Sequence, residues 1–154
     1  MAVLILHPDP PERPLPVSAA REANLNPDNR AAVRVLIVED DFFVGAELEQ
    51  RLREAGFSVI GIAATSVEAL SLADSEKPTL AIMDVRLADE RDGVDTAIEM
   101  FVRFGVRSIF ATAYAHQELK DKAVRAEPIA WLQKPYTADA VIAEIVTAGF
   151  NPGN

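Results

Sequence analysis

The sequence contains no cysteine and no long apolar run. The first absence excludes disulfide bonds, thiolate metal sites and cysteine nucleophiles, and it suits a reducing cytoplasm, where we expect the protein to reside. No run approaches the roughly 18–20 apolar residues that cross a bilayer, so we expect no membrane span. The apolar start, residues 1–6, is ended by His7-Pro8 and has no basic lead or cleavage site, which argues against a signal peptide.

The sequence also has fewer basic residues than acidic ones. The chain has 15 Lys and Arg against 24 Asp and Glu, for a net charge of −9. The arginines are scattered along the sequence, whereas a nucleic-acid surface needs them clustered to offset phosphate repulsion. We therefore expect no nucleic-acid partner.

Proline divides the chain into two parts of different character. Six of the ten prolines lie within the first 32 residues, and proline resists the interior of helices and sheets. This predicts a flexible, Pro-rich leader over residues 1–32, a folded domain over 33–150 and a short tail over 151–154. The apolar segment Val3–Leu6 leaves open that the leader docks on the domain or on a partner.

From Val33 onward, short apolar runs alternate with segments of helical periodicity. Strands are predicted over residues 33–38, 57–63, 79–83, 106–111 and 129–132. Helices are predicted over residues 44–55, 65–74, 94–102, 116–125 and 137–146. This alternation predicts an α/β fold, namely a flavodoxin-like, doubly wound, five-stranded parallel sheet of order 2-1-3-4-5 with five helices.

Polar side chains follow four of the five predicted strands, and the carboxyl ends of parallel strands are where such folds bind ligands. These side chains belong to Glu39, Asp40, Asp84, Thr112 and Lys134. Grouped carboxylates suit a hard divalent cation such as Mg²⁺, and one carboxylate beside it can act as a nucleophile that forms an aspartyl phosphate. A lysine and a hydroxyl can then offset the charge on the phosphoryl oxygens.

Four segments in this order, "VLIVEDD", "LAIMDVRL…DG", "IFATAYA" and "WLQKPY", resemble the receiver domain of bacterial two-component response regulators. The resemblance covers about residues 33–148. It implies that Asp84 is the phosphoacceptor and that Mg²⁺ is the cofactor. It also implies a metal site with Asp40 as a direct ligand, Glu39 acting through water, and Asp84 and the backbone carbonyl of Arg86 completing the set.

The same resemblance assigns the remaining site residues. Thr112 and Lys134 match the residues that bind the phosphoryl group, and Lys134-Pro135 matches the family's cis peptide. Thr112 and Trp131 match the switch positions, although Trp131 stands where many receivers have Tyr or Phe. The loop after Asp84 also differs, since it has Ala88 in place of a frequent proline and is one residue longer than in many receivers.

The segment "FATAY" is similar to the Phe-Ala-Thr-Gly-Tyr signature of a subgroup from alphaproteobacteria, whose single-domain regulators pair with kinases of the HWE and related classes. The resemblance thus implies a stand-alone receiver that takes a phosphoryl group from a histidine kinase or a histidine phosphotransfer protein. No effector domain follows before Asn154, so we expect output by protein binding or phosphate shuttling from a monomer or weak homodimer. We expect no enzyme activity beyond Mg²⁺-dependent self-phosphorylation and slow autodephosphorylation.

Two other functions remain open. A phosphorylation-independent, receiver-like interaction module is compatible with Ala88 and Trp131, although it would not need the acidic pair. An aspartate-nucleophile phosphatase of similar architecture is disfavoured because such enzymes usually carry a second acid two residues after the nucleophile, where this chain has Arg86.

Several nearby polar residues have simpler structural interpretations. Asp41 and Asp92 are predicted to be helix N-caps, while residues 89–91 are predicted to form a solvated loop. We expect Tyr114 to be a rim contact and His116 a surface residue near the entry to the site.

Overall fold

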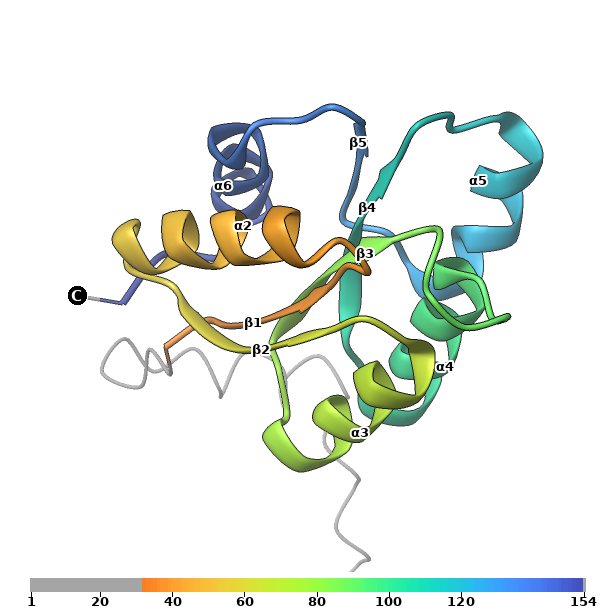
Figure 1. Ribbon diagram of the computed structural model, residues 1–154, viewed down its shortest axis with the longest axis horizontal. Coiled ribbons are helices and arrows are strands. Elements are labelled where there is room, and N and C mark those ends of the chain that lie inside the picture. Colours follow the sequence, from red (N-terminus) through yellow and green to blue (C-terminus); the bar gives the residue numbers. More distant parts are fainter. Residues whose placement is uncertain (1–31, 154) are drawn as a thin grey trace, which may run out of the picture. The chain divides into compact units, whose positions relative to one another are not determined.

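The computed structural model describes residues 32–153, so the predictions for the leader fall almost entirely outside the described residues. The described part contains one five-stranded parallel sheet of order β2-β1-β3-β4-β5 (Figure 1). The strands are β1 (Arg34–Val38), β2 (Ser58–Ala63), β3 (Leu80–Asp84), β4 (Arg107–Thr112) and β5 (Ala130–Gln133). The helices are α2 (Phe42–Glu54), α3 (Ser66–Glu76), α4 (Gly93–Phe104), α5 (Gln117–Ala123) and α6 (Ala138–Thr147). The predicted fold class is therefore confirmed.

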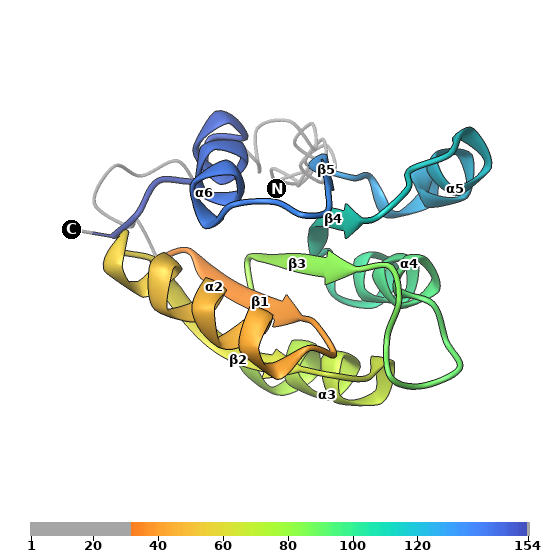
Figure 2. The ribbon, with the colours of Figure 1, turned by 45° about the horizontal axis from the view of Figure 1, so that its top comes forward.

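The helices cover both faces of the sheet (Figure 2). One core lies on the side of α2 and α6, and the other lies on the side of α3, α4 and α5. Strand β1 supplies both, because Leu36 and Val38 enter the second core while Val35 and Ile37 enter the first. Alternate residues of a strand point to opposite faces, so a strand buried on both sides must be apolar throughout.

Four of the five helices begin at a side-chain oxygen that accepts hydrogen bonds from the first turn. These N-caps are Asp41 for α2, Thr65 for α3, Asp92 for α4 and Thr137 for α6. The predicted caps Asp41 and Asp92 are thus confirmed. At α3, Thr65 Oγ1 accepts from the backbone nitrogen of Glu68, but the Glu68 carboxylate accepts from the backbone of Ala64 and not from Thr65, so only half of a capping box forms.

The predicted helix over residues 116–125 was too long. Helix α5 ends at Ala123, and a 3₁₀ turn, Val124–Ala126, follows it. The next residue, Glu127, has a left-handed backbone with φ of 46°. Pro128 comes directly after it, and a residue before proline is disfavoured in the helical conformation, which accounts for the early end.

The parallel register brings the residues after the strands to one edge of the sheet. Asp84 lies opposite Ala111 of β4, and Thr112 lies opposite Gln133 of β5. Val38 lies opposite Met83, which places Glu39 and Asp40 next to Asp84. The fold therefore assembles one polar site from segments that are up to 95 residues apart.

Candidate functional site

Three carboxylates form the centre of the site. Glu39 and Asp40 follow β1, and Asp84 is the last residue of β3. One carboxylate oxygen from each lies within 4.8 Å of the others. Glu39 and Asp84 are almost completely buried, whereas Asp40 is exposed. Buried like charges at this separation repel one another and require a compensating cation.

Lys134 supplies one positive charge from the end of β5. Its Nζ lies 3.0 Å from Asp84 Oδ2 and 3.4 Å from Glu39 Oε2. Burial lowers the pKa of Lys134, but the hydrogen bond and the charge of Asp84, together with Glu39, outweigh it and raise the pKa above its ordinary value. Lys134 is therefore a permanent ammonium group in contact with the predicted acceptor.

Glu39 is the carboxylate whose charge is least well compensated. Burial raises its pKa to about 7, and the backbone hydrogen bond from Asp41, 3.0 Å from Glu39 Oε1, offsets only part of this. The charge of Asp84 raises the pKa further, while Lys134 lowers it. Since Lys134 lies closer to Asp84 than to Glu39, one ammonium group does not neutralise both.

A cavity of about 480 Å³ adjoins these groups. Asp40, Asp84, Arg86, Thr112 and Lys134 all line it, so the structure brings these predicted site residues together. Its outer part is lined by residues that follow β4, namely Ala113, Tyr114, His116 and Leu119.

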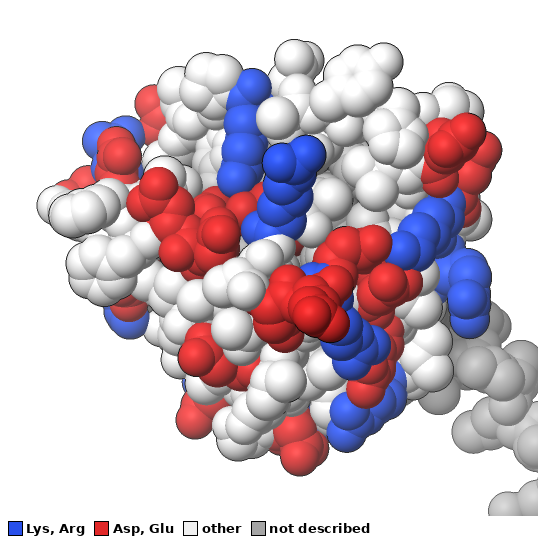
Figure 3. All heavy atoms as spheres, turned by 45° about the vertical axis from the view of Figure 1, so that its right-hand side comes forward, with Lys and Arg blue, Asp and Glu red and all other residues white. Residues whose placement is uncertain are grey.

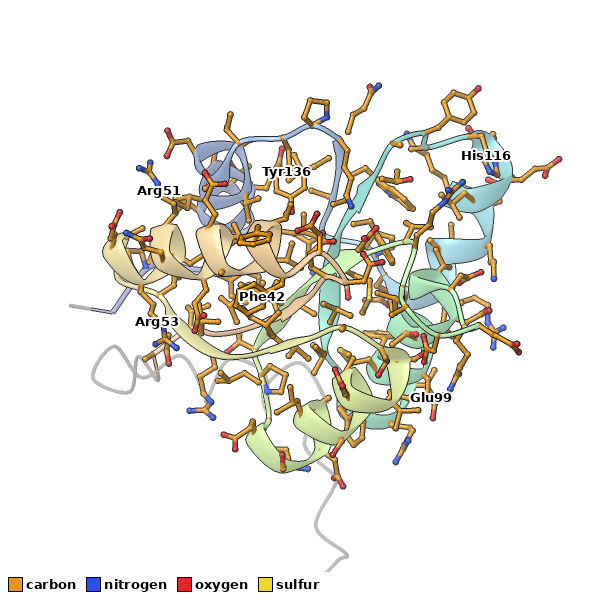
Figure 4. The ribbon with its side chains drawn as sticks, in the orientation of Figure 1. Phe42, Arg51, Arg53, Glu99, His116 and Tyr136 are labelled. Carbon is orange, nitrogen blue, oxygen red and sulfur yellow. The ribbon has the colours of Figure 1, made fainter. Side chains whose placement is uncertain are left out.

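Thr112 does not yet contact the acceptor. Its hydroxyl Oγ1 lies 3.3 Å from the backbone nitrogen of Tyr114 and 3.4 Å from the Tyr114 carbonyl oxygen. Tyr114 itself is exposed, which matches the expected rim position. His116 has a structural task that the sequence analysis missed, since its Nδ1 accepts from the backbone of Leu119 and caps α5 (Figure 4).

Trp131 lies on β5, beside Phe110 of β4. Its ring stacks on Phe110 with 4.6 Å between the ring centroids and 18° between the planes. Trp131 packs against the core shared with α3 and α4. The two rings are on paired residues of β4 and β5, and Phe110 lies two residues before Thr112.

One prediction for the loop between β3 and α4 is wrong. Asp89 was predicted to be solvated with its neighbours, but its Oδ2 accepts hydrogen bonds of 2.9 Å from both the backbone nitrogen and the Oγ of Ser66. The contact joins this loop to the first residue of α3, 23 residues earlier in the chain, and has no local sequence signal, which is why sequence reasoning missed it.

The chemistry of this donor set fits a hard cation. All the side-chain donors are carboxylate oxygens, which Mg²⁺ and Ca²⁺ prefer, and the exposed Asp40 leaves one side open to water. Burial, together with the charge of Asp84, raises the pKa of Glu39, and a cation bound beside this carboxylate would lower it. The acidic triad is typical of the Mg²⁺ site of receiver domains.

Comparison with known protein families gives a match over residues 35–146 to the response regulator receiver domain. The chain belongs to this family. Receiver domains act in two-component signalling, are phosphorylated by histidine kinases, and are typically not enzymes apart from their own phosphorylation chemistry. Within residues 32–153, no helix combines the length and the apolar character needed to cross a bilayer.

Similarity to individual proteins supports the same family assignment. The receiver is 37% identical over 123 residues to the transcriptional regulatory protein PdtaR of Mycobacterium tuberculosis, a match that covers 79% of this chain and 60% of PdtaR. It is 36% identical over 120 residues to the phyllosphere-induced regulator PhyR of Methylorubrum extorquens, covering 77% of this chain and 44% of PhyR. The chain thus spans less than two thirds of the length of either regulator.

Solved structures show the same fold. A CheY-like receiver domain protein from Methanospirillum hungatei is 29% identical and superposes with a TM-score of 0.69, covering 76% of this chain and 93% of that protein. The receiver domain of a modulated diguanylate cyclase from Desulfovibrio desulfuricans is 32% identical with the same TM-score and the same coverage of both chains.

Proposed function

We propose that this receiver works as a stand-alone phosphorylation switch with Asp84 as its phosphoacceptor. The observation that supports this most directly is the position of Asp84. Its carboxylate is held by Lys134 at 3.0 Å, lies beside two further carboxylates and faces a cavity open to a donor. This combination places a nucleophile, a cation site and a fixed positive charge together.

The proposed step is transfer from a phosphohistidine. A carboxylate oxygen of Asp84 forms the new bond to phosphorus, the phosphorus–nitrogen bond breaks, and the released imidazole takes up a proton from solvent. The ammonium group of Lys134 stays beside the phosphoryl oxygens and offsets their charge.

The cofactor in this proposal is Mg²⁺. Asp40, Asp84 and the backbone carbonyl of Arg86 would hold the cation directly, and Glu39 would hold it through water. When bound, it neutralises charge on the carboxylates and on the incoming phosphoryl group.

The proposed switch involves Thr112 and Trp131. The Thr112 hydroxyl must leave its backbone partners at Tyr114 to reach a phosphoryl group on Asp84. That movement would shift the loop after β4 and alter the packing around Trp131, so a local charge would bias a two-state surface near α5, β5 and α6.

The proposed partners are a histidine kinase, assigned to the HWE class by the "FATAY" likeness, or a histidine phosphotransfer protein, together with a downstream protein that recognises the phosphorylated surface. The net charge of −9 supports protein partners over nucleic acid. The name of PdtaR describes a transcriptional regulatory protein, but this chain matches only 60% of it. The proposal therefore concerns the receiver alone.

Intact mass spectrometry tests the proposal. The wild type, Asp84→Asn and the control Asp74→Asn, at an exposed acid on α3, are incubated with Mg²⁺ and a phosphorylated histidine kinase. A gain of one phosphoryl group, roughly 80 Da for HPO₃, is expected in the wild type and the control and not in Asp84→Asn. If the folded wild type gains no mass from any kinase or small phosphodonor, the proposal is wrong and the interaction-module hypothesis takes its place.

A further inference from the structure

The loop that follows the acceptor, residues 85–92, is fastened to the start of α3. Asp89 Oδ2 accepts two hydrogen bonds of 2.9 Å, one from the backbone nitrogen and one from the Oγ of Ser66. One residue earlier, the backbone nitrogen of Ala88 donates to the carbonyl of Ala64 at 3.1 Å. These three bonds attach the tip of the loop to the segment between β2 and α3.

The bonds of Asp89 are shielded from water. Ser66 is completely buried, and the second carboxylate oxygen, Oδ1, is buried without a hydrogen-bond partner among the described residues. Hydrogen bonds to a charged group are stronger than neutral ones when water is excluded. The unpaired oxygen works in the opposite direction, because a buried acceptor without a donor costs free energy. The two bonds therefore favour the attached loop, and the unpaired oxygen reduces that preference.

The same loop positions the acceptor carboxylate directly. The backbone nitrogen of Arg86 donates to Asp84 Oδ1 at 3.1 Å, and the backbone nitrogen of Gly93 donates to the carbonyl of Val85 at 2.7 Å. Any movement of the loop tip is therefore transmitted through a few residues to the orientation of Asp84. The loop contains no proline that would stiffen it on its own.

We propose that Ser66 and Asp89 form a latch that holds the loop in the conformation in which the Asp84 carboxylate and the Arg86 backbone are ready for the cation and the phosphoryl group. This inference rests on the proposed function of Asp84. Neither latch residue touches the cavity, so both are positioning residues. The latch replaces the rigidity that this loop lacks in its sequence.

The test compares Asp89→Ala, which removes both bonds, with Ser66→Ala, which removes only the bond from Oγ. Glu90→Ala is the matched control, because Glu90 is an exposed acid in the same loop. Hydrogen exchange of the protein without metal reports the loop itself, and calorimetric titration with Mg²⁺ alone reports the cation site.

In Asp89→Ala, we expect the amide of Ala88 to exchange at least about tenfold faster and the Kd for Mg²⁺ to rise about fivefold, the effect of one or two hydrogen bonds. Ser66→Ala should give a smaller change in the same direction, and Glu90→Ala should match the wild type. In the Asp89→Ala background, adding Ser66→Ala should change the Kd no further, since the hydroxyl has lost its acceptor.

Unchanged Mg²⁺ affinity in Asp89→Ala, in a protein with normal melting behaviour, would overturn the latch. The failure of the proposed function looks different, because then the wild type itself neither binds Mg²⁺ nor gains a phosphoryl group. If the wild type binds Mg²⁺ and gains a phosphoryl group, but the latch variants behave like the wild type, only the latch is refuted.

Discussion

Glu39 occupies a position where a charged carboxylate is costly. It is 4% exposed, and burial raises its pKa from an ordinary value of 4.5 to about 7. The folded protein without metal therefore binds a proton that the unfolded chain releases between about pH 4.5 and 7. In that window, the free energy of unfolding falls as the pH rises, because the unfolded state binds fewer protons than the folded state.

We expect this pH dependence to be carried by Glu39 and to disappear in Glu39→Gln. From pH 5 to pH 8 in EDTA, the wild type should lose stability relative to the variant, by on the order of 2–3 kcal/mol for a shift of this size. Saturating Mg²⁺ should reduce the loss, since it favours the ionised carboxylate. Urea unfolding at several pH values measures the difference. If the free energy of unfolding changes with pH in the same way in both proteins, Glu39 does not hold the proton.

Gly93 is required where α4 begins. A Cβ atom there would lie 1.9 Å from the carbonyl oxygen of Asp84 and 2.8 Å from its carbon, both parts of the backbone. Neither can move without displacing the end of β3, which carries the acceptor. The position therefore tolerates only glycine in this packing.

Gly93→Ala should destabilise the fold by about 3 kcal/mol and slow phosphorylation of Asp84, since overpacking against backbone forces a shift of the strand end. Gly105→Ala is the matched control. Gly105 has a φ of 69° but nothing within 4 Å of the added Cβ, so it should cost only about 1 kcal/mol and leave the phosphorylation rate unchanged. Equal rates in both variants would contradict the role given to Gly93.

At the scale of elements, the sequence predicts most of what the structure contains. The five apolar runs and the helical periodicity between them are local signals, and the right-handed crossover of parallel strands restricts how they assemble. Polar residues before apolar periodic segments predict helix starts, as Asp41 and Asp92 show. The gathering of Asp84, Thr112 and Lys134 then follows from strand order alone.

Contacts made by loop residues with the starts of helices could not all be predicted in this way. The bond between Asp89 and Ser66 depends on the path of an eight-residue connection, and nothing in the sequence around Asp89 indicates a buried partner. The capping of α5 by His116 was missed because histidine is an uncommon N-cap, and its Nδ1 accepts only when it is unprotonated.

Asp41 offers a test that separates a helix cap from a metal ligand. Its Oδ1 accepts from the backbone nitrogens of Phe43 and Val44 at 3.0 and 3.2 Å. We expect Asp41→Ala to cost about 1 kcal/mol while keeping the rise in melting temperature that millimolar Mg²⁺ produces. Asp40→Asn should show the reverse pattern, with little loss of stability but no Mg²⁺ response. Thermal melts with and without Mg²⁺ decide between them, and a retained response in Asp40→Asn would contradict the proposed ligand set.

For the whole molecule, ion pairs connect the elements around the site. Lys122 of α5 lies 2.8 Å from Asp92 and 2.9 Å from Asp95, both at the start of α4. Hydrogen bonds to Asp92 and Asp95 raise the pKa of Lys122, so this link stays charged at neutral pH. Acidic and basic side chains lie side by side on this face (Figure 3). The link ties α5, which borders the cavity, to the helix that follows the acceptor loop.

The single tryptophan makes a change across this assembly measurable. Trp131 is stacked on Phe110, and the two rings lie on strands that end at Thr112 and at Gln133, the residue before Lys134. If phosphorylation draws the Thr112 hydroxyl toward Asp84, the space it leaves should let the Trp131 ring move inward, away from water. We therefore expect the fluorescence emission maximum of Trp131 to shift to shorter wavelength when the wild type is phosphorylated.

Two variants show whether the shift has this origin. Asp84→Asn should show no change with the same donor, because it cannot be phosphorylated. Thr112→Val keeps the shape of the side chain but lacks the hydroxyl, so it should accept the phosphoryl group, more slowly, without the full spectral shift. Mass spectrometry on the same samples reports the phosphorylated fraction. A fully phosphorylated wild type with unchanged fluorescence emission would mean that Trp131 stays stacked on Phe110, and the proposed role of Trp131 in the switch would then be wrong.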